Sequence, residues 1–194
     1  MAKLVAMNNP YNTNLDRNPA NFQPLTPLTF LERAASVYPN HTAIVHGKLR
    51  CNYSDFYSRS RQLASALSEQ GIARGDTVSV ILSNTPAMLE AHYGVPMCGA
   101  VLHSINTRLD PDTIAYQLDH ANSKALIVDR EFLKTAKTSL ELAGVSPILI
   151  EFNDSEYPIK ESLPGAIEYE EFLLKGDKNY NWLMPEDEWD AISL

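Results

Sequence analysis

The sequence predicts an α/β fold, a doubly wound and mostly parallel β-sheet flanked by helices. Four apolar runs, at 78–82, 100–105, 125–129 and 147–152, alternate with helical patterns. The nearly continuous apolar character of these runs indicates strands that are covered on both faces, as in a parallel sheet. Strands and helices at this spacing are typical of βαβ units.

Before the first of these runs, the chain predicts an arm, a short helix and a hairpin. Residues 1–27 are rich in proline and asparagine, which favours an irregular arm on a surface. Thr29 and Glu32 have the spacing of a capping box, and apolar residues follow at helical intervals. Two β-prone runs around Gly47 then predict a β-hairpin over residues 42–53.

Capping residues predict where the later helices begin and end. Ser54 is the expected N-cap of a long helix, and Gly71 fits the left-handed position that follows its last turn. Thr85 and Asp110 each precede a proline, the order that favours an N-cap and a first helical residue. A further helix is expected over residues 130–143.

The last part of the chain differs from the rest. Residues 153–194 are acidic, and we expect them to cross the surface of the α/β subdomain at 28–152. One short helix is predicted within them, at 167–174, and residues 191–194 should enter the sheet as an incipient strand. The predicted organisation is therefore an arm (1–27), an incomplete α/β subdomain (28–152) and an acidic connecting segment (153–194).

Composition excludes several classes of protein. Hydrophobic residues make up 44% and charged residues 21% of the 194, which is typical of a folded domain. Residues 1–150 carry 13 basic and 12 acidic side chains, whereas residues 151–194 carry 3 and 12, so the formal charge of −8 belongs to the end of the chain. A nucleic-acid binder would show a basic stripe, and none is present in the sequence.

Targeting signals and cysteines predict a location. Cys51 and Cys98 are far apart in apolar surroundings, which favours free thiols in a reducing compartment. The sequence begins without the apolar run of a secretory signal, and no stretch reaches the length of a membrane span. We expect a cytoplasmic protein.

The sequence offers few residues for chemistry. His103 lies near the end of a predicted parallel strand, where open α/β sheets place ligands, and Asn106 and Arg108 follow in the loop. These three are the candidate pocket residues; the alternative is a hydrogen-bonded histidine that fixes the loop. His92 and His120 have no partner at metal-ligand spacing, so no metal site is predicted.

The motifs of common nucleotide sites and nucleophiles are missing from the sequence. It has no G-x-S-x-G elbow, no G-x-G-x-x-G after a strand and no Walker loop. We therefore predict no catalytic residue and no cofactor-binding residue in this chain alone.

Three stretches together resemble one family. They are PLTFLERAASVYPNHTAIVHG, LASALSEQGIARGDTVSVILSNTPAMLEAHYGVPMCGAVLHSINTRL and EDEWDAISL. They are similar to the N-terminal region of AMP-forming acyl-CoA synthetases in the adenylate-forming superfamily, with short-to-medium-chain acyl-CoA ligases as the nearest subgroup. The resemblance runs from about Leu25 to Leu194 and implies the first part of the large N-terminal domain of such enzymes.

The resemblance also implies what these residues lack. In the family, the segment similar to DAISL leads into a phosphate loop, Thr-Ser-Gly-Thr-Thr-Gly followed by Pro-Lys-Gly, which is absent here. The complete family enzymes use ATP, Mg²⁺ and CoA to convert a carboxylic acid to its thioester. Acyl adenylation concentrates negative charge that a site must neutralise, and the sequence offers little for this beyond Arg108.

Three hypotheses follow. In the first, the chain is the N-terminal part of an acyl-CoA ligase and is inactive by itself. In the second, it is a non-catalytic module that pairs with a separate chain or self-associates through exposed apolar surface. In the third, it is an unrelated flavodoxin-like binding domain, because an α/β pattern alone does not fix function.

Overall fold

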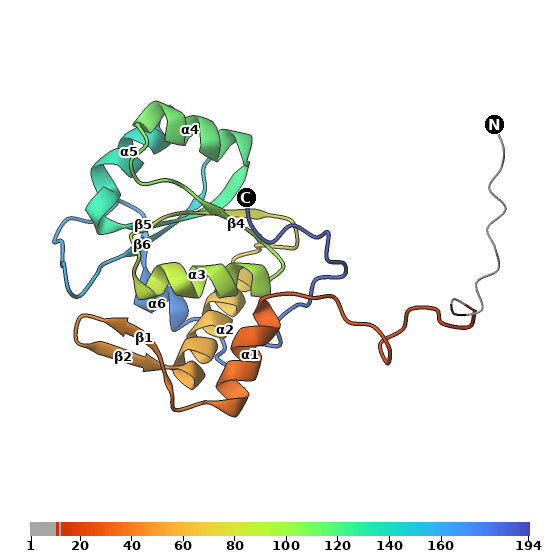
Figure 1. Ribbon diagram of the computed structural model, residues 1–194. Coiled ribbons are helices and arrows are strands. Elements are labelled where there is room, and N and C mark those ends of the chain that lie inside the picture. The colour runs from red at the N-terminus through yellow and green to blue at the C-terminus, as the bar shows by residue number, and fades with distance from the viewer. Residues whose placement is uncertain (1–10, 12) are drawn as a thin grey trace, which may run out of the picture.

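A five-stranded parallel sheet forms the centre of the protein, as seen in the computed structural model that describes residue 11 and residues 13–194 (Figure 1). The strand order is β4-β3-β5-β6-β7, and the neighbouring strands are parallel. The strands are β3 (Thr77–Ile81), β4 (Val101–Ser104), β5 (Ser123–Asp129), β6 (Ile148–Phe152) and β7 (Ile167–Glu168). The predicted α/β class with a mostly parallel sheet is confirmed.

The sheet is doubly wound. The chain passes from β3 to β4 on one side, then reverses and adds β5, β6 and β7 on the other. The reversal creates a switch point between β3 and β5, and crevices at the carboxyl ends of strands at such points are where open α/β sheets bind ligands.

Helices cover both faces of the sheet, as Figure 1 shows, with α4 and α5 on one side and α2, α3 and α6 on the other. The two cores follow from the alternation of side chains along each strand: Val78 and Val80 face α2 and α3, whereas Ile81 faces α4 and α5. The helices are α1 (Leu28–Val37), α2 (Tyr53–Glu69), α3 (Pro86–Met97), α4 (Pro111–His120), α5 (Leu133–Leu142) and α6 (Tyr169–Leu173).

Helices α2 and α3 approach each other closely at Gly94. A Cβ atom there would lie 2.8 Å from the Ser60 carbonyl oxygen of α2, so the contact requires glycine. The predicted left-handed residue after α2 is confirmed, because Gly71 has a φ of +86°.

Two predicted helix starts are wrong. Thr29 does not cap α1, because its hydroxyl donates to the Thr26 carbonyl oxygen at 2.9 Å. The helix begins at Leu28, and Thr29 lies inside it. The N-cap of α2 is Asn52 rather than Ser54, and its side chain accepts the backbone N–H of Asp55 at 2.8 Å. Asparagine is as good an N-cap as serine. Asn52 is the last residue of β2, so the helix begins directly after the hairpin.

Other predicted elements agree with the structure. The hairpin is present as antiparallel β1 (Thr42–His46) and β2 (Leu49–Asn52). Asp110 caps α4 by accepting the Thr113 N–H at 3.0 Å. The helix expected at 130–143 begins as a short 3₁₀ helix, η2 (Arg130–Phe132), that leads into α5.

The prediction for the acidic segment is partly wrong. The first two residues of the helix expected at 167–174 instead form β7, which pairs with Ile150 and Glu151 of β6, and only Tyr169–Leu173 is helical. Further on, Leu102 of β4 donates its N–H to the Ile192 carbonyl oxygen at 3.0 Å, and Leu194 donates to Leu102 at 2.9 Å. The predicted incipient strand at 191–194 therefore lies parallel along the outer edge of β4.

Candidate functional site

A cavity of about 940 Å³ lies on the α2–α3 side of the sheet, near the carboxyl ends of β3 and β6. We call it the hairpin cavity, because one wall is formed by the β1–β2 hairpin. It is lined by His46, Leu49, Arg50, Cys51, Ser54, Asp55, Ser58, Arg59, Arg61, Gln62, Pro86, Glu90, Phe152, Asn153, Asp154, Ser155, Glu170, Lys178 and Asn179. Its position at the carboxyl ends of strands, where α/β folds bind ligands, makes it the candidate site.

A buried carboxylate forms the floor of the hairpin cavity. Glu90 of α3 is 1% exposed, and Arg59 of α2 donates to both of its carboxylate oxygens, from Nε at 2.5 Å and from Nη2 at 3.2 Å. The hydroxyl of Tyr169, itself fully buried, donates to the same carboxylate at 2.8 Å. Arg59 also donates to Glu170, at 2.6 Å and 2.9 Å. We call these four residues the Glu90 cluster.

Opposing electrostatic effects act within the Glu90 cluster, where one guanidinium pairs with two carboxylates. Burial raises the pKa of Glu90, and the hydrogen bonds and positive charge of Arg59 oppose that rise. Burial acts against the charge of Arg59 as well, but its hydrogen bonds to Glu170 and Glu90 outweigh it and raise the pKa of the guanidinium. The pKa of Tyr169 is raised well above its usual value by burial and by the neighbouring Glu90. Paired in this way, the cluster is suited to hold structure rather than to transfer protons.

A second polar contact closes the cavity at the hairpin. His46 of β1 lies 2.8 Å and 3.0 Å from the two carboxylate oxygens of Asp154, which follows β6. The same loop reaches the turn of the hairpin, because Lys48 donates its backbone N–H to Glu156 at 3.2 Å. These contacts fix the hairpin against the sheet.

The switch point between β3 and β5 is acidic. Ser83, after β3, donates its hydroxyl to Glu131 at 2.9 Å. Asp129, at the end of β5, is 3% exposed, and burial raises its pKa against the opposing hydrogen bond from the Glu131 N–H. Arg130 is committed to Glu151, at 2.6 Å. A triphosphate needs positive charge and free N–H groups, and these side chains supply the opposite.

The structure separates the three predicted pocket residues. His103 of β4 has its Nδ1 2.9 Å from the hydroxyl of Ser79, which lies 2.5 Å from that of Ser123. Burial lowers the pKa of His103. Asn106 and Arg108 are exposed in the following loop, where the Asn106 side chain accepts the Arg108 N–H at 3.0 Å. None of the three lines the hairpin cavity, and their role as pocket residues stays a prediction.

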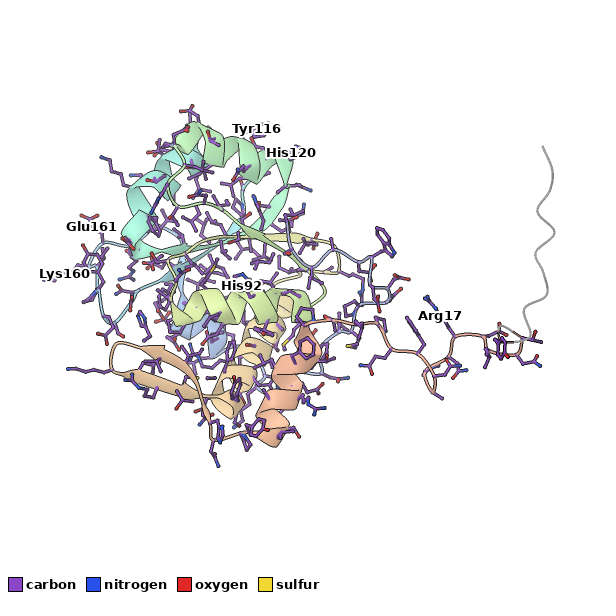
Figure 2. All side chains as sticks on the ribbon, viewed as in Figure 1. Arg17, His92, Tyr116, His120, Lys160 and Glu161 are labelled. Carbon is purple, nitrogen blue, oxygen red and sulfur yellow. The ribbon has the colours of Figure 1, made fainter. Side chains whose placement is uncertain are left out.

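Other candidates for metal binding or nucleophilic chemistry are separated as well. Figure 2 shows His92 on α3 and His120 on α4, on opposite sides of the sheet. Within residue 11 and residues 13–194, no group of three His, Cys, Asp or Glu side chains could hold a metal ion. Both cysteines are free and buried, and burial raises the pKa of Cys98 to about 11. In that same described part of the chain, every helix is too short or too polar to cross a membrane.

Comparison with known proteins decides the family. Residues 31–178, most of the chain, match the AMP-binding enzyme family. The chain belongs to this family. As an AMP-binding family member, it is 47% identical over 193 residues to an acetate/butyrate–CoA ligase of Arabidopsis thaliana that is named as peroxisomal, and 44% identical over 195 residues to an acetate–CoA ligase of Humulus lupulus. Each alignment covers 93% of this chain and 34% of the relative, so the chain spans about a third of their length, consistent with an N-terminal portion.

Solved structures support the same AMP-binding fold. The anthranilate CoA ligase AuaEII, solved in complex with anthranoyl-AMP, has a TM-score of 0.81 at 18% identity and covers 92% of this chain and 33% of its own. A benzoate CoA ligase from Burkholderia xenovorans has a TM-score of 0.66 at 25% identity and covers 77% and 28%. The family resemblance drawn from the three sequence stretches is confirmed by the family match over residues 31–178 and by the two CoA ligase relatives.

Sequence reasoning missed the hairpin cavity. Its lining comes from the hairpin, α2, α3, the end of β6 and the acidic segment, and no motif joins these parts. One signal was available: Glu90 lies in a helix with an apolar sequence, and a carboxylate in such a place requires a buried partner.

Proposed function

We propose that residues 1–194 are the N-terminal part of an AMP-forming acyl-CoA ligase. The complete enzyme would join a carboxylic acid to CoA through an acyl-adenylate, releasing AMP and diphosphate. The observation that carries the proposal is the match of residues 31–178 to the AMP-binding family, together with relatives at 44% and 47% identity that are named CoA ligases. The arm (1–27), the α/β subdomain (28–152) and the acidic segment (153–194) remain our proposed divisions.

In this proposal the chain supplies scaffold, and ATP, Mg²⁺ and CoA are bound mainly by other parts of the enzyme. Two features of the described residues support that division of labour. The switch point presents Glu131 and the buried Asp129 where a phosphate would need cations. The guanidinium of Arg59 is already paired with two carboxylates. We therefore expect residues 1–194 alone to be inactive.

The proposed substrate is a short-chain carboxylic acid. The two relatives compared above are named for acetate or butyrate, and they match nearly the whole chain at 44% and 47% identity. We assign no substrate-contacting residue within this chain.

A chimera provides the direct test. Residues 25–194 would replace the matching third of the Arabidopsis acetate/butyrate–CoA ligase, and acyl-CoA formation from acetate, butyrate, octanoate and benzoate would be measured. An active chimera that prefers acetate or butyrate supports the proposal. A chimera that folds, as judged by a cooperative thermal transition, but forms no acyl-adenylate would contradict the scaffold role.

The isolated chain gives the complementary test. Calorimetric titration with ATP and Mg²⁺ should show no binding, and acyl-CoA formation should be absent. Tight, magnesium-dependent ATP binding by these residues would overturn the view that they lack a phosphate cradle.

A non-catalytic module that pairs with another chain is the second candidate. It is favoured by the outer edge formed by residues 191–194 and by the side chain of Trp189, which is 94% exposed. Exposed edge strands and apolar residues promote association. Size-exclusion chromatography beside a hydrophobic-dye assay separates the two candidates, because a compact monomer that binds no dye would argue against the module.

We also propose a cytoplasmic location, because both cysteines are free thiols, as is usual for proteins in a reducing compartment. The Arabidopsis relative is named as peroxisomal, so the proposal needs its own test. A fluorescent fusion at the N-terminus of the complete gene product, imaged beside a peroxisomal marker, decides between the two compartments.

A further inference from the structure

We propose that the tip of the β1–β2 hairpin, residues 45–50, is a flap that opens and closes the hairpin cavity. Three residues of the tip, His46, Leu49 and Arg50, line the cavity, so movement of the tip would change access to it. The proposal does not depend on the proposed ligase activity. It rests on how the tip is held, in comparison with the base of the same hairpin.

The base of the hairpin is anchored in the core. Ile44 of β1 and Cys51 of β2 are paired across the hairpin, and they are 5% and 9% exposed within the core on the α2–α3 side. The hairpin forms a two-stranded sheet of its own, apart from the five-stranded sheet (Figure 1). Its position therefore depends on the contacts of its side chains and its turn rather than on pairing with a strand of the main sheet.

The tip has no apolar anchor of this kind. Within residues 45–50, all of which the structure describes, no side chain is buried. Val45 and Leu49 are 62% and 46% exposed. Regions with few buried apolar contacts open at a lower free energy than the core of a protein does. The tip can therefore separate from the body while Ile44 and Cys51 stay in place.

Contacts within the tip make it rigid. The pairs Val45–Arg50 and His46–Leu49 continue the antiparallel ladder as far as the turn. Across the turn, Nη1 of Arg50 donates to the carbonyl oxygens of Gly47 and Leu49, both at 2.8 Å. These contacts join parts of the tip to each other and are kept when the tip moves. We therefore expect the tip to move as one unit.

Two carboxylates in the loop after β6 hold the tip in place. Nε2 of His46 lies 2.8 Å and 3.0 Å from the carboxylate oxygens of Asp154, and the Lys48 N–H donates to Glu156 at 3.2 Å. A Cβ atom at Gly47 would overlap the carboxylate of Glu156, so glycine allows the close approach. Among the described residues, these are the hydrogen bonds that join the tip to the rest of the protein outside its own strands. We call Asp154 and Glu156 the latch.

The latch is suited to reversible opening. The side chains of His46 and Asp154 are 22% and 13% exposed, so water can reach both partners when they separate. A hydrogen bond that is exchanged for hydrogen bonds to water contributes little net stability. Lids over binding sites are drawn from such elements of low local stability.

The two cysteines report on opening. Cys51 lines the cavity from the base of the hairpin, and Cys98, buried at the end of α3, is the internal reference. The 194-residue chain would be labelled with iodoacetamide, and the rate at each cysteine followed by mass spectrometry of its peptides. Asp154→Ala should speed labelling of Cys51 about tenfold, the effect of losing one hydrogen bond to a charged group, and leave Cys98 unchanged.

The matched control is Glu161→Ala, which also removes one carboxylate. Glu161 lies in the same acidic segment, is exposed (Figure 2) and makes no hydrogen bond or ion pair within the described part of the chain. The acidity of the Cys51 thiol should be the same in both variants, because burial raises its pKa and the smaller effects come from charged residues of α2 and α3. Equal labelling rates in the two variants, or equal acceleration at both cysteines, would overturn the proposal.

A measurement on the unsubstituted chain does not depend on any variant. Labelling would be repeated in low concentrations of urea, whose effect on an opening step scales with the surface that the step exposes. Opening of the flap exposes little surface, so the rate at Cys51 should hardly change, whereas the rate at Cys98 should rise steeply with global unfolding. The same steep dependence at both cysteines would show that Cys51 is reached only by unfolding, and that the tip is no flap.

Discussion

The sheet body, residues 28–152, and the acidic segment, residues 153–194, are stabilised in different ways. The body buries apolar strands between two layers of helices, and β3, β5 and β6 have apolar contacts on both faces. The acidic segment buries few side chains, chiefly Leu163, Tyr169, Phe172 and Leu173, and otherwise depends on polar contacts. This difference indicates that the local pattern of apolar residues specifies the fold of the body, whereas a few contacts between residues far apart in the sequence position the acidic segment.

The largest expected effect comes from the apolar anchor of the segment. Phe172 is fully buried against the core on the α2–α3 side. Phe172→Ala removes that side chain and leaves a cavity, so we expect a loss of about 3–5 kcal/mol in the free energy of unfolding. Urea denaturation followed by circular dichroism measures it.

A matched substitution shows whether burial is the cause. Tyr157 belongs to the same segment but is 66% exposed, and Tyr157→Ala should change stability by about 0.5 kcal/mol or less. Similar effects of the two substitutions would mean that the segment is not anchored where the structure places it.

The next largest effect comes from the polar anchor. Arg59→Met leaves the buried carboxylate of Glu90 without its cation, and we expect a loss of about 3 kcal/mol at pH 7. The double variant Arg59→Met/Glu90→Leu should recover most of the loss, because no buried charge remains. A double-mutant cycle with Glu90→Leu alone gives the coupling energy.

The sign of the pH dependence sharpens this prediction. Burial raises the pKa of Glu90, and removing Arg59 takes away the main opposing effect. A carboxyl group with a raised pKa in the folded state contributes stability at low pH that is lost as pH rises. The destabilisation by Arg59→Met should therefore be smaller at pH 5 than at pH 7, and a penalty independent of pH would contradict an unpaired carboxylate as its cause.

A smaller effect is expected from the hydroxyl that joins the segment to the cluster. Tyr169→Phe removes one hydrogen bond to Glu90 but leaves Arg59 in place, so we expect a loss of about 1–2 kcal/mol. Limited proteolysis of the variant should cleave the acidic segment faster while the body is cleaved at the wild-type rate. A uniform increase along the chain would show that the two regions unfold together.

The sequence specified the body well because its signals are local. Continuous apolar runs identified β3, β4, β5 and β6, and Asp110 marked the start of α4. The errors occurred where local signals compete. Thr29 and Glu32 have capping-box spacing, but the helix begins before Thr29, and Glu32 instead accepts the Tyr57 hydroxyl. β7 was read as helix because two residues are too few to show a period.

The candidate site was harder to predict, since its residues are joined only by tertiary structure. Arg59, Glu90 and Glu170 come from three helices or helix starts, and their sequence spacing carries no information about their contact. Asn106 and Arg108 were proposed from topology, which places loops at an edge of the sheet but does not say which loops enclose a cavity.

The smallest predicted effect concerns His103 in the body. Burial lowers its pKa, so the neutral ring is favoured in the folded state, and the stability that this group contributes above its ordinary pKa is lost as pH falls through the folded value. His103 and Glu90 should therefore respond to pH in opposite directions. A histidine ring titration followed by NMR should give His103 a midpoint below the ordinary value for a histidine, with His103→Gln assigning the signal. A midpoint equal to or above the ordinary value for a histidine would show that the hydrogen bond with Ser79, rather than burial, controls the ring.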